Sequence, residues 1–235
     1  MASESDPADE SDETGGKRRV LLAGATGLVG GHCLHKLLRG GTFDEVHALA
    51  RRPIDIGESR LHLLITAFDD LDQRRPVVAH AGLCALGTTI AKAGSQTAFR
   101  RVDHDAVVAY ARWARRGGVA TFVLVSSVGA AKDARSFYLR VKGQTEEEVA
   151  QVGFPRLVIL RPGLLLGARQ ERRLGEEIAQ VVLPRFSPVL IGPLRRYRAI
   201  SAERVAGAMV TAALSTQPGH FIWHTDQILA NAGPL

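Results

Sequence analysis

The segment Val20-Leu21-Leu22-Ala23-Gly24-Ala25-Thr26-Gly27-Leu28-Val29-Gly30 decides the fold of this 235-residue chain. Its first four residues form an apolar run, which predicts a buried strand. Beyond the glycines, apolar residues from Val29 to Leu38 recur at the spacing of a helix with one buried face. A turn with three glycines that connects a strand to a helix is typical of dinucleotide binding.

The three glycines of this turn have separate candidate roles in binding a cofactor. Gly24 permits the tight turn, Gly27 lets the main chain approach a pyrophosphate, and Gly30 lets the helix pack closely against the strand. The start of the helix presents unpaired N–H groups and the positive end of its dipole to phosphates. The predicted cofactor-binding residues of the turn are Gly24, Ala25, Thr26, Gly27, Leu28, Val29 and Gly30.

Strands and helices alternate along the rest of the chain. Apolar patterns predict strands at 46–50, 61–65, about 81–86, 121–125 and 157–160, and helices at 99–116 and 136–152. Such alternation implies parallel pairing with right-handed crossovers. We therefore predict an α/β fold, a Rossmann-type doubly wound parallel sheet, in which residues 17–235 form a single domain.

The first sixteen residues differ in composition from the rest. They contain six acidic residues, no basic residue and few large apolar side chains, which predicts a disordered acidic tail at 1–16. The whole chain has a net charge of 30 − 24 = +6, so residues 17–235 carry 30 − 18 = +12. A basic domain suits a phosphorylated cofactor. Because no basic run is interleaved with aromatic residues, we expect no specific nucleic-acid partner.

The two cysteines, Cys33 and Cys84, form no disulfide framework and no metal-binding motif. This usage fits a reducing compartment. The acidic N-terminus has no apolar signal core, and the longest apolar stretch, residues 20–31, is too short to span a bilayer. We therefore expect a cytoplasmic location and no membrane partner.

The residues that follow the second predicted strand favour a cofactor with a third phosphate. An NAD-binding protein needs a carboxylate at the end of this strand to hold the ribose hydroxyls. Asp44 and Glu45 precede the strand and lie at its other end, whereas Arg51 and Arg52 follow it. Guanidinium groups match phosphate oxygens, so the sequence predicts NADP(H) held by Arg51 and Arg52. Solvated surface arginines are the alternative interpretation.

Tyr138 and Lys142 are four residues apart on a predicted helix and share one of its faces. Ser126 and Ser127 end the fifth predicted strand, at the edge where open α/β sheets bind ligands. Tyr138 is the candidate acid/base for the proton that accompanies hydride transfer, Lys142 is its partner, and Ser127 is favoured over Ser126 to orient the substrate oxygen. A Tyr-x-x-x-Lys pair is common by chance, and only its place in the Rossmann pattern favours a catalytic site.

Together these motifs resemble an atypical branch of the short-chain dehydrogenases/reductases, the Tat-interacting-protein-like NADPH-binding oxidoreductases. The resemblance rests on the glycine turn, on Tyr138-x-x-x-Lys142, on Arg161-Pro162-Gly163 and on the Cys-Ala-Leu-Gly-Thr-Thr of residues 84–89. It runs from about residue 20 to beyond residue 173, and more loosely to residue 213, which is most of the chain.

The resemblance implies an NADPH-binding Rossmann domain with a small C-terminal substrate cap at about 164–200. Tyr138 would donate or accept the proton and Lys142 would bind the ribose. Further cofactor contacts implied by the resemblance fall at Leu86, Gly87, Thr88, Leu165 and Arg173. The chain departs from the family at Ala67, where an aspartate often lies near the adenine.

Two functions fit these observations. The first is an NADP(H)-dependent oxidoreductase that acts on a small carbonyl or alcohol substrate. The alternative is a non-catalytic regulator that senses NADP(H) and binds a protein partner, although no motif indicates such a partner. Two histidine pairs, His32 with His35 and His220 with His224, lack a third ligand nearby in sequence, so we expect no bound metal.

Overall fold

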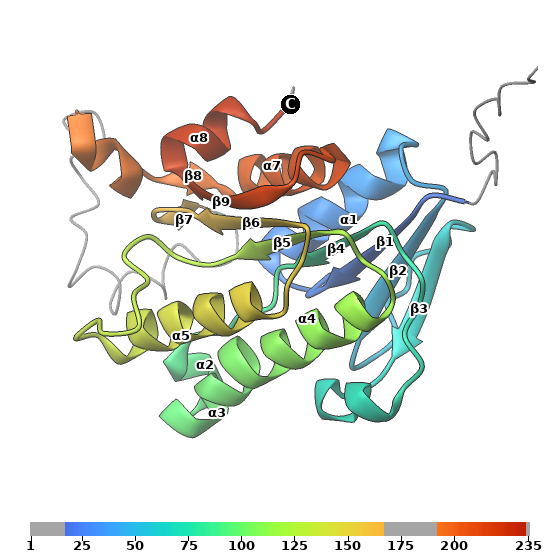
Figure 1. Ribbon diagram of the computed structural model, residues 1–235, viewed down its shortest axis with the longest axis horizontal. Helices are drawn as coiled ribbons and strands as arrows, with labels where there is room; N and C mark the ends of the chain where they lie inside the picture. The colour runs from blue at the N-terminus through green and yellow to red at the C-terminus, as the bar shows by residue number, and fades with distance from the viewer. Residues whose placement is uncertain (1–16, 167–191, 234–235) are drawn as a thin grey trace, which may run out of the picture.

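Seven parallel strands form the main sheet in the computed structural model, which describes residues 17–166 and 192–233 (Figure 1). The strands lie in the order β3-β2-β1-β4-β5-β6-β9, and every neighbouring pair is parallel. Their bounds are β1 Arg19–Ala23, β2 Glu45–Ala50, β3 Leu61–Ile65, β4 Ala81–Cys84, β5 Thr121–Val125, β6 Arg156–Arg161 and β9 Gly219–His224. This topology confirms the predicted doubly wound Rossmann-type fold.

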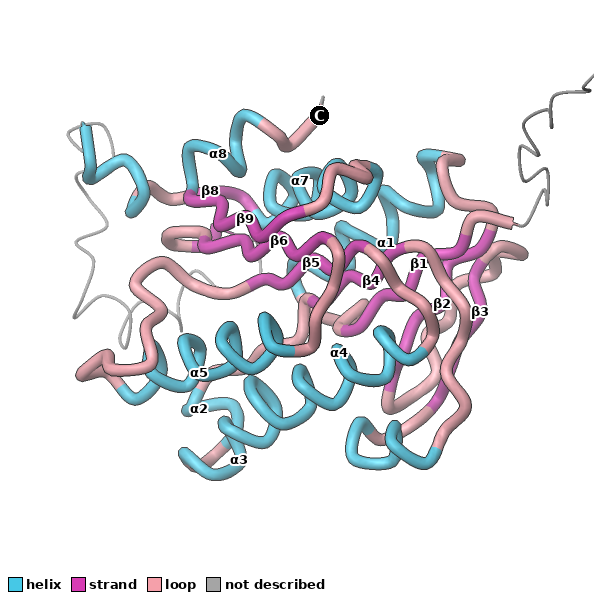
Figure 2. Tube along the Cα trace, in the orientation of Figure 1, coloured by secondary structure: helices cyan, strands magenta, loops and turns pink. Residues whose placement is uncertain are grey.

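Helices cover both faces of the sheet (Figures 1 and 2). On one side lie α1 (Leu28–Gly40), α7 (Ala202–Leu214) and α8 (Thr225–Ala230). On the other lie α4 (Ala106–Arg116) and α5 (Phe137–Gln151). The shorter elements are η1 Phe68–Gln73, α2 Ile90–Ala93, α3 Gln96–Arg100, η2 Arg101–Asp105, η4 Gly192–Tyr197, and the two-stranded sheet of β7 Leu165–Leu166 and β8 Ile200–Ser201.

The core has two halves because successive strand residues point to opposite faces. In β1, Val20 and Leu22 pack toward α1 and α7, whereas Leu21 packs toward α4. All three side chains are fully buried. Burial on both faces explains why this strand is a continuous apolar run in the sequence.

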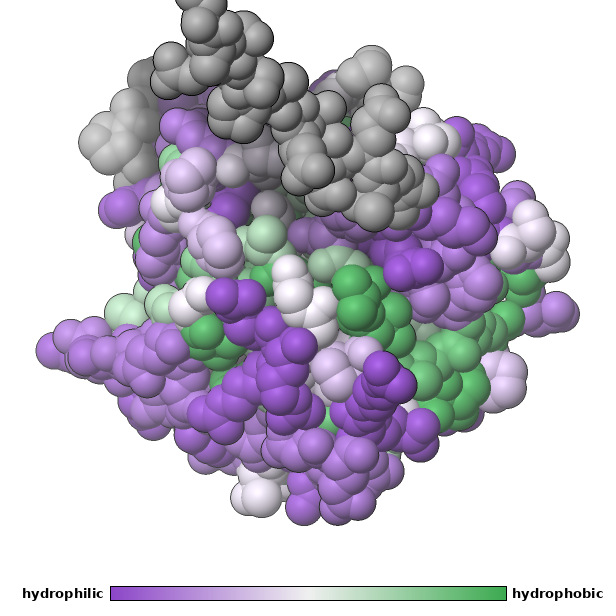
Figure 3. All heavy atoms as spheres, turned by 45° about the vertical axis from the view of Figure 1, so that its right-hand side comes forward, coloured by the Kyte–Doolittle hydropathy of each residue, from purple (hydrophilic) through white to green (hydrophobic). Residues whose placement is uncertain are grey.

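The surface is mixed in character. On the face that Figure 3 shows, most side chains are hydrophilic and apolar side chains gather in a few patches between them. Large apolar residues that are exposed include Ile56, Ile65 and Val78. In the part of the chain that the structure describes, no helix combines the length and the hydrophobicity needed to cross a membrane.

Several elements differ from the sequence-based expectation. The helix predicted at 99–116 begins at Gln96, where the Ser95 hydroxyl accepts a hydrogen bond from the Ala98 amide at 3.1 Å, and it contains the π-helical turn η2. Helices α7 and α8 and strand β9 were not predicted; the apolar run of β9 is only three residues long, Phe221-Ile222-Trp223, and it lies at the edge of the sheet. The predicted substrate cap at 164–200 and the acidic tail fall mainly outside the described residues and stay predictions.

Candidate functional site

The glycine turn lies at the point where the strand order reverses, between β1 and β4, which is where doubly wound sheets bind ligands. Gly24 has a φ of 90°, a conformation that favours glycine, and a Cβ there would lie 2.5 Å from the Ala85 carbonyl oxygen. Gly27 is the N-cap of α1 and its amide donates to the Gly24 carbonyl at 2.9 Å. The turn therefore brings bare backbone and a helix start to one edge, which fits a pyrophosphate.

Gly30 is the position in this turn with the least room for a side chain. A Cβ added there would overlap the Gly24 carbonyl oxygen, whereas a Cβ at the neighbouring Gly31 would meet its nearest atom at 3.6 Å, an ordinary contact. We expect Gly30→Ala to lower the free energy of unfolding by about 1–3 kcal/mol, as overpacked sites do. Gly31→Ala should be neutral or stabilising, because alanine is the better helix former.

Urea denaturation of the two variants and the wild type measures this difference. Calorimetry with NADPH would show in addition whether the displaced turn loses cofactor affinity. Equal stability of the two variants would contradict the close approach of α1 to the turn.

A cleft runs along this edge of the sheet and has two parts. The wider part, about 500 Å³, is lined by Gly24, Thr26 and Gly27 of the turn and by Arg51, Asp69, Lys92 and Arg101, among others. Ala25 and Gly30 are buried and line neither part among the described residues. The narrower part, about 170 Å³, extends from Leu28 and Val29 past the β4 end to the end of β5 and to α5. The predicted residues in the wall of the narrower part are Gly27, Leu28, Val29, Leu86, Gly87, Thr88, Ser127, Tyr138, Lys142 and Leu165.

Lys142 forms a buried ion pair that the sequence analysis did not predict. Its Nζ lies 2.8 Å from Oδ1 of Asp103, and both side chains are almost completely buried. The other carboxylate oxygen of Asp103 accepts a hydrogen bond from the Thr88 amide at 2.8 Å. Asp103 therefore connects Lys142 of α5 to the loop that follows β4.

The charge of Lys142 depends on this carboxylate. Burial acts to lower the pKa of Lys142, but the negative charge of Asp103, together with Tyr138, offsets burial and holds the pKa above its ordinary value. A Cβ at Gly87 would lie 3.5 Å from the Asp103 carboxylate and 3.7 Å from the Lys142 ammonium. The ammonium is thus protonated, fixed in position and adjacent to the wall of the cleft.

Asp103 reaches this position because it lies in η2, the π-helical turn between α3 and α4. Its main-chain oxygen accepts a hydrogen bond from the Thr145 hydroxyl of α5 at 2.9 Å. In the same turn His104 is buried, and its ring nitrogens lie 2.8 Å from Asp105 and 3.0 Å from Glu148. Turns of this kind often occur at functional sites, and here the turn places the Asp103 carboxylate against Lys142.

Tyr138 and the two serines approach the narrow part of the cleft from different elements. Tyr138 is the second residue of α5. Its ring packs against that of Phe99, with the two ring centroids 5.5 Å apart. Ser126 is buried and its hydroxyl has no hydrogen-bond partner among the described residues, whereas Ser127 is half-buried and its hydroxyl donates to the Val128 carbonyl at 3.4 Å. Both serines line the cleft with Tyr138.

Of the remaining predicted residues, only some line the cleft. Arg51 lies in the wall of the wider part, whereas Arg52 follows it and is not among the described residues that line the cleft. Ala67 lines the cleft without a carboxylate, and Asp69 supplies one two residues later. Arg173 lies outside the described residues.

Sequence reasoning missed four charged residues of the site: Asp69, Lys92, Arg101 and Asp103. Lys92 and Arg101 line the wider part of the cleft and add to its positive charge. No motif marks either residue. Asp103 had a signal, because an acid at the helical spacing of Phe99 and Tyr110 stands on an otherwise apolar face and requires a buried partner.

The topology and the glycine turn define a Rossmann-type dinucleotide-binding protein. Residues 24–216 match the family described as NAD(P)H-binding, and the chain belongs to that family. This match confirms the predicted nicotinamide dinucleotide cofactor, which the sequence analysis specified as NADP(H).

Several relatives match most of the chain. It is 32% identical over 205 residues to "Protein FMP52, mitochondrial" of Debaryomyces hansenii, which covers 85% of this chain and 88% of that protein. A protein of the same name from Aspergillus clavatus is 36% identical over 208 residues, with the same coverage. "Protein HTATIP2" of Rattus norvegicus is 38% identical over 168 residues and covers 69% of each chain. The last relative confirms the resemblance to Tat-interacting-protein-like proteins.

Solved structures show the same fold at low identity. The human epimerase family protein SDR39U1 with NADPH has a TM-score of 0.58 and 20% identity, covering 87% of this chain and 72% of that one. MoeE5 in complex with UDP-glucose and NAD has a TM-score of 0.61 and 17% identity, covering 90% and 80%.

The expected cytoplasmic location is wrong on this comparison. The FMP52 relatives, which match this chain over 85% of its length, are named as mitochondrial proteins. The expectation relied on isolated cysteines and on an acidic N-terminus, and neither distinguishes one reducing compartment from another.

Proposed function

We propose that this protein is an NADP(H)-dependent oxidoreductase of the short-chain dehydrogenase type that acts on a small carbonyl or alcohol substrate. The observation that carries the proposal is the joint position of Tyr138 and Lys142 in the wall of the cleft that begins at the glycine turn. Membership of the NAD(P)H-binding family supplies the cofactor class.

The residues of the narrow part divide the chemistry among them. NADPH, when bound, supplies the hydride. The Tyr138 hydroxyl gives its proton to the substrate oxygen in the direction of reduction, and the Lys142 ammonium stabilises the tyrosinate that results. Ser127 is proposed to orient the substrate oxygen, and the loop residues Leu86, Gly87 and Thr88 to hold the nicotinamide side.

Consumption of NADPH with a panel of aldehydes, ketones and quinones tests this proposal. Calorimetry with NADPH on the same sample separates binding from turnover. Turnover of at least one substrate class supports an enzyme. Binding of NADPH without turnover across the panel would replace the enzyme by an NADP(H)-sensing protein.

The preference for NADPH over NADH is proposed to depend on Arg51. Arg51 lines the wider part of the cleft, and charge-assisted hydrogen bonds to phosphate are strong. We expect Arg51→Ala to weaken NADPH binding by about tenfold and to leave NADH binding unchanged. The effect on NADPH lies at the lower end of the range for charged hydrogen bonds because the side chain is exposed.

Arg52→Ala is the matched comparison for this measurement. Arg52 does not line the described cleft, so its removal should have the smaller effect on NADPH affinity. Equal weakening of NADPH and NADH binding in Arg51→Ala would show that Arg51 does not recognise the extra phosphate.

A further inference from the structure

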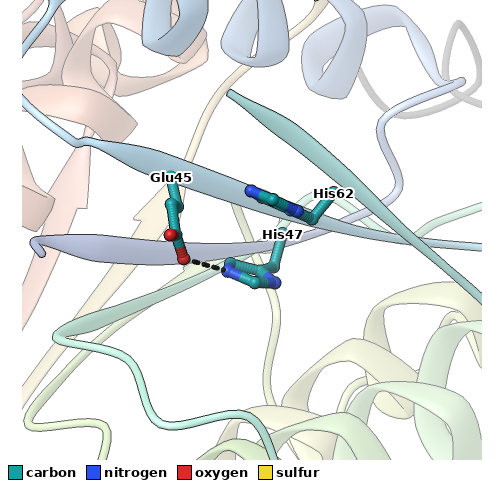
Figure 4. A group of neighbouring side chains, drawn as sticks. All are labelled: Glu45, His47 and His62. Carbon is teal, nitrogen blue, oxygen red and sulfur yellow. Dashed lines mark hydrogen bonds and ion pairs between the residues drawn. The ribbon is translucent and has the colours of Figure 1, made fainter. Parts of the chain in front are cut away.

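Three side chains of the kinds that bind metals meet on the sheet (Figure 4). Glu45 and His47 are two residues apart on β2, so both point to the same face. His62 of β3 pairs in register with His47 and therefore shares that face. Their ligand atoms all lie within 4.8 Å of one another. None of the three is among the described residues that line the cofactor cleft.

The backbone fixes this convergence. Neighbouring strands lie about 4.8 Å apart and alternate residues of one strand about 7 Å apart, so three side chains on one face reach a common point without unusual rotamers. Ligand atoms around a tetrahedral zinc ion are about 3.3 Å apart, given bond lengths near 2.0 Å. His62 is exposed, so rotation of its side chain can close the difference.

The arrangement of these groups suits a cation. A carboxylate oxygen of Glu45 lies 3.1 Å from Nε2 of His47. Carboxylate oxygens and imidazole nitrogens are the kinds of ligand atom that transition metals accept. The His47 and His62 rings stack with their centroids 4.7 Å apart.

Two basic residues next to Glu45 are the main competitors of a cation. Lys17 Nζ lies 2.9 Å from Oε1, and Arg19 Nε lies 2.8 Å from Oε2. The Lys17 side chain is 65% exposed, so this pair is weak and easily exchanged. A carboxylate has about four lone-pair positions, so Glu45 can keep Arg19 as a partner that orients it while it binds a metal.

We propose that Glu45, His47 and His62 form a binding site for a divalent transition metal of the zinc class. Two imidazoles and one carboxylate are ligands that Zn²⁺, Co²⁺ and Ni²⁺ accept, and a set of three leaves further positions for water. Because the ligands come from β2 and β3, the bound ion ties the edge strand to its neighbour. Binding to the folded state alone then stabilises the protein as the metal concentration rises.

Calorimetric titration of the full chain with ZnCl₂ tests this site. We expect saturable binding in the wild type and an affinity about 10- to 100-fold lower in His47→Gln and in His62→Gln. Even the loss of a residue that only hydrogen-bonds to a metal ligand lowers metal affinity by this much. Because His62 is exposed, its replacement should leave the fold intact. Addition of Zn²⁺ should raise the melting temperature of the wild type but not that of either variant.

Two further variants distinguish this site from other interpretations. The double variant His32→Gln/His35→Gln removes the other close histidine pair of the N-terminal half and should bind Zn²⁺ like the wild type. Lys17→Met removes a competing cation and should bind more tightly. Absence of saturable binding in the wild type, or undiminished binding in His62→Gln, would overturn the proposal and leave a hydrogen-bonded cluster only.

Discussion

Tyr138→Phe is expected to lower turnover by about 10²- to 10⁴-fold, the contribution typical of a general acid/base. The substitution removes the hydroxyl and keeps the ring, which packs against Phe99. The fold and the glycine turn should therefore be unaffected, and NADPH affinity should stay within about twofold of the wild type, since the change removes no charge. The measurements are kcat with a substrate from the carbonyl panel and the dissociation constant for NADPH by calorimetry.

Tyr110→Phe is the control for this variant. It makes the same chemical change at a tyrosine that is fully buried among Trp113 and Phe122, away from the cleft. Its turnover should match the wild type. An unchanged kcat in Tyr138→Phe would exclude Tyr138 as the proton donor. A parallel loss of NADPH affinity would assign it a binding role instead.

The parts of the fold that could be predicted from sequence are those with a local physical signal. The β1 run and the glycines that follow it could be placed because burial on both faces makes an apolar strand and because a close backbone approach requires glycine. Strand β9 was not placed, since its apolar run is only three residues long, too short to distinguish an edge strand from a loop. Its pairing with β6 depends on contacts that only the assembled sheet provides.

In the candidate site, too, only the residues with a local signal could be predicted from the sequence. Tyr138 and Lys142 could be paired because four residues span about one helical turn. The partner of Lys142 comes from η2, about forty residues earlier in the chain, and no spacing rule connects the two. Glu45 and His47 of β2 and His62 of β3 likewise could not be grouped from the sequence, because only the pairing of the two strands brings them together. Long-range pairs of this kind depend on strand register and helix packing.

Lys142→Met should be the most destabilising single change in this set. It leaves the Asp103 carboxylate buried without its cation, a situation that typically costs about 3–5 kcal/mol. Asp103→Asn should cost less, because the amide oxygen can still accept from the Thr88 amide and because Lys142 can give up its proton when no carboxylate holds it. Urea denaturation of each variant measures the loss.

The double variant Asp103→Asn/Lys142→Met separates the ion pair from ordinary packing. With both charges removed, most of the stability lost in Lys142→Met should return, because buried pairs replaced by neutral groups are often tolerated. Lys132→Met is the matched control: Lys132 lies 2.7 Å from Glu147, but both side chains are exposed, so its loss should have little effect on stability. Equal costs for Lys142→Met and Lys132→Met would contradict a buried charged pair.

The same double variant also tests why the lysine is kept charged. It should fold nearly as well as the wild type yet lack the ammonium next to Tyr138, so turnover should remain low while stability recovers. Recovery of both properties would mean that the pair serves only packing. Recovery of stability without recovery of turnover would mean that Asp103 keeps Lys142 charged for catalysis at the reacting oxygen. For stability alone, a neutral pair would serve equally well at this position.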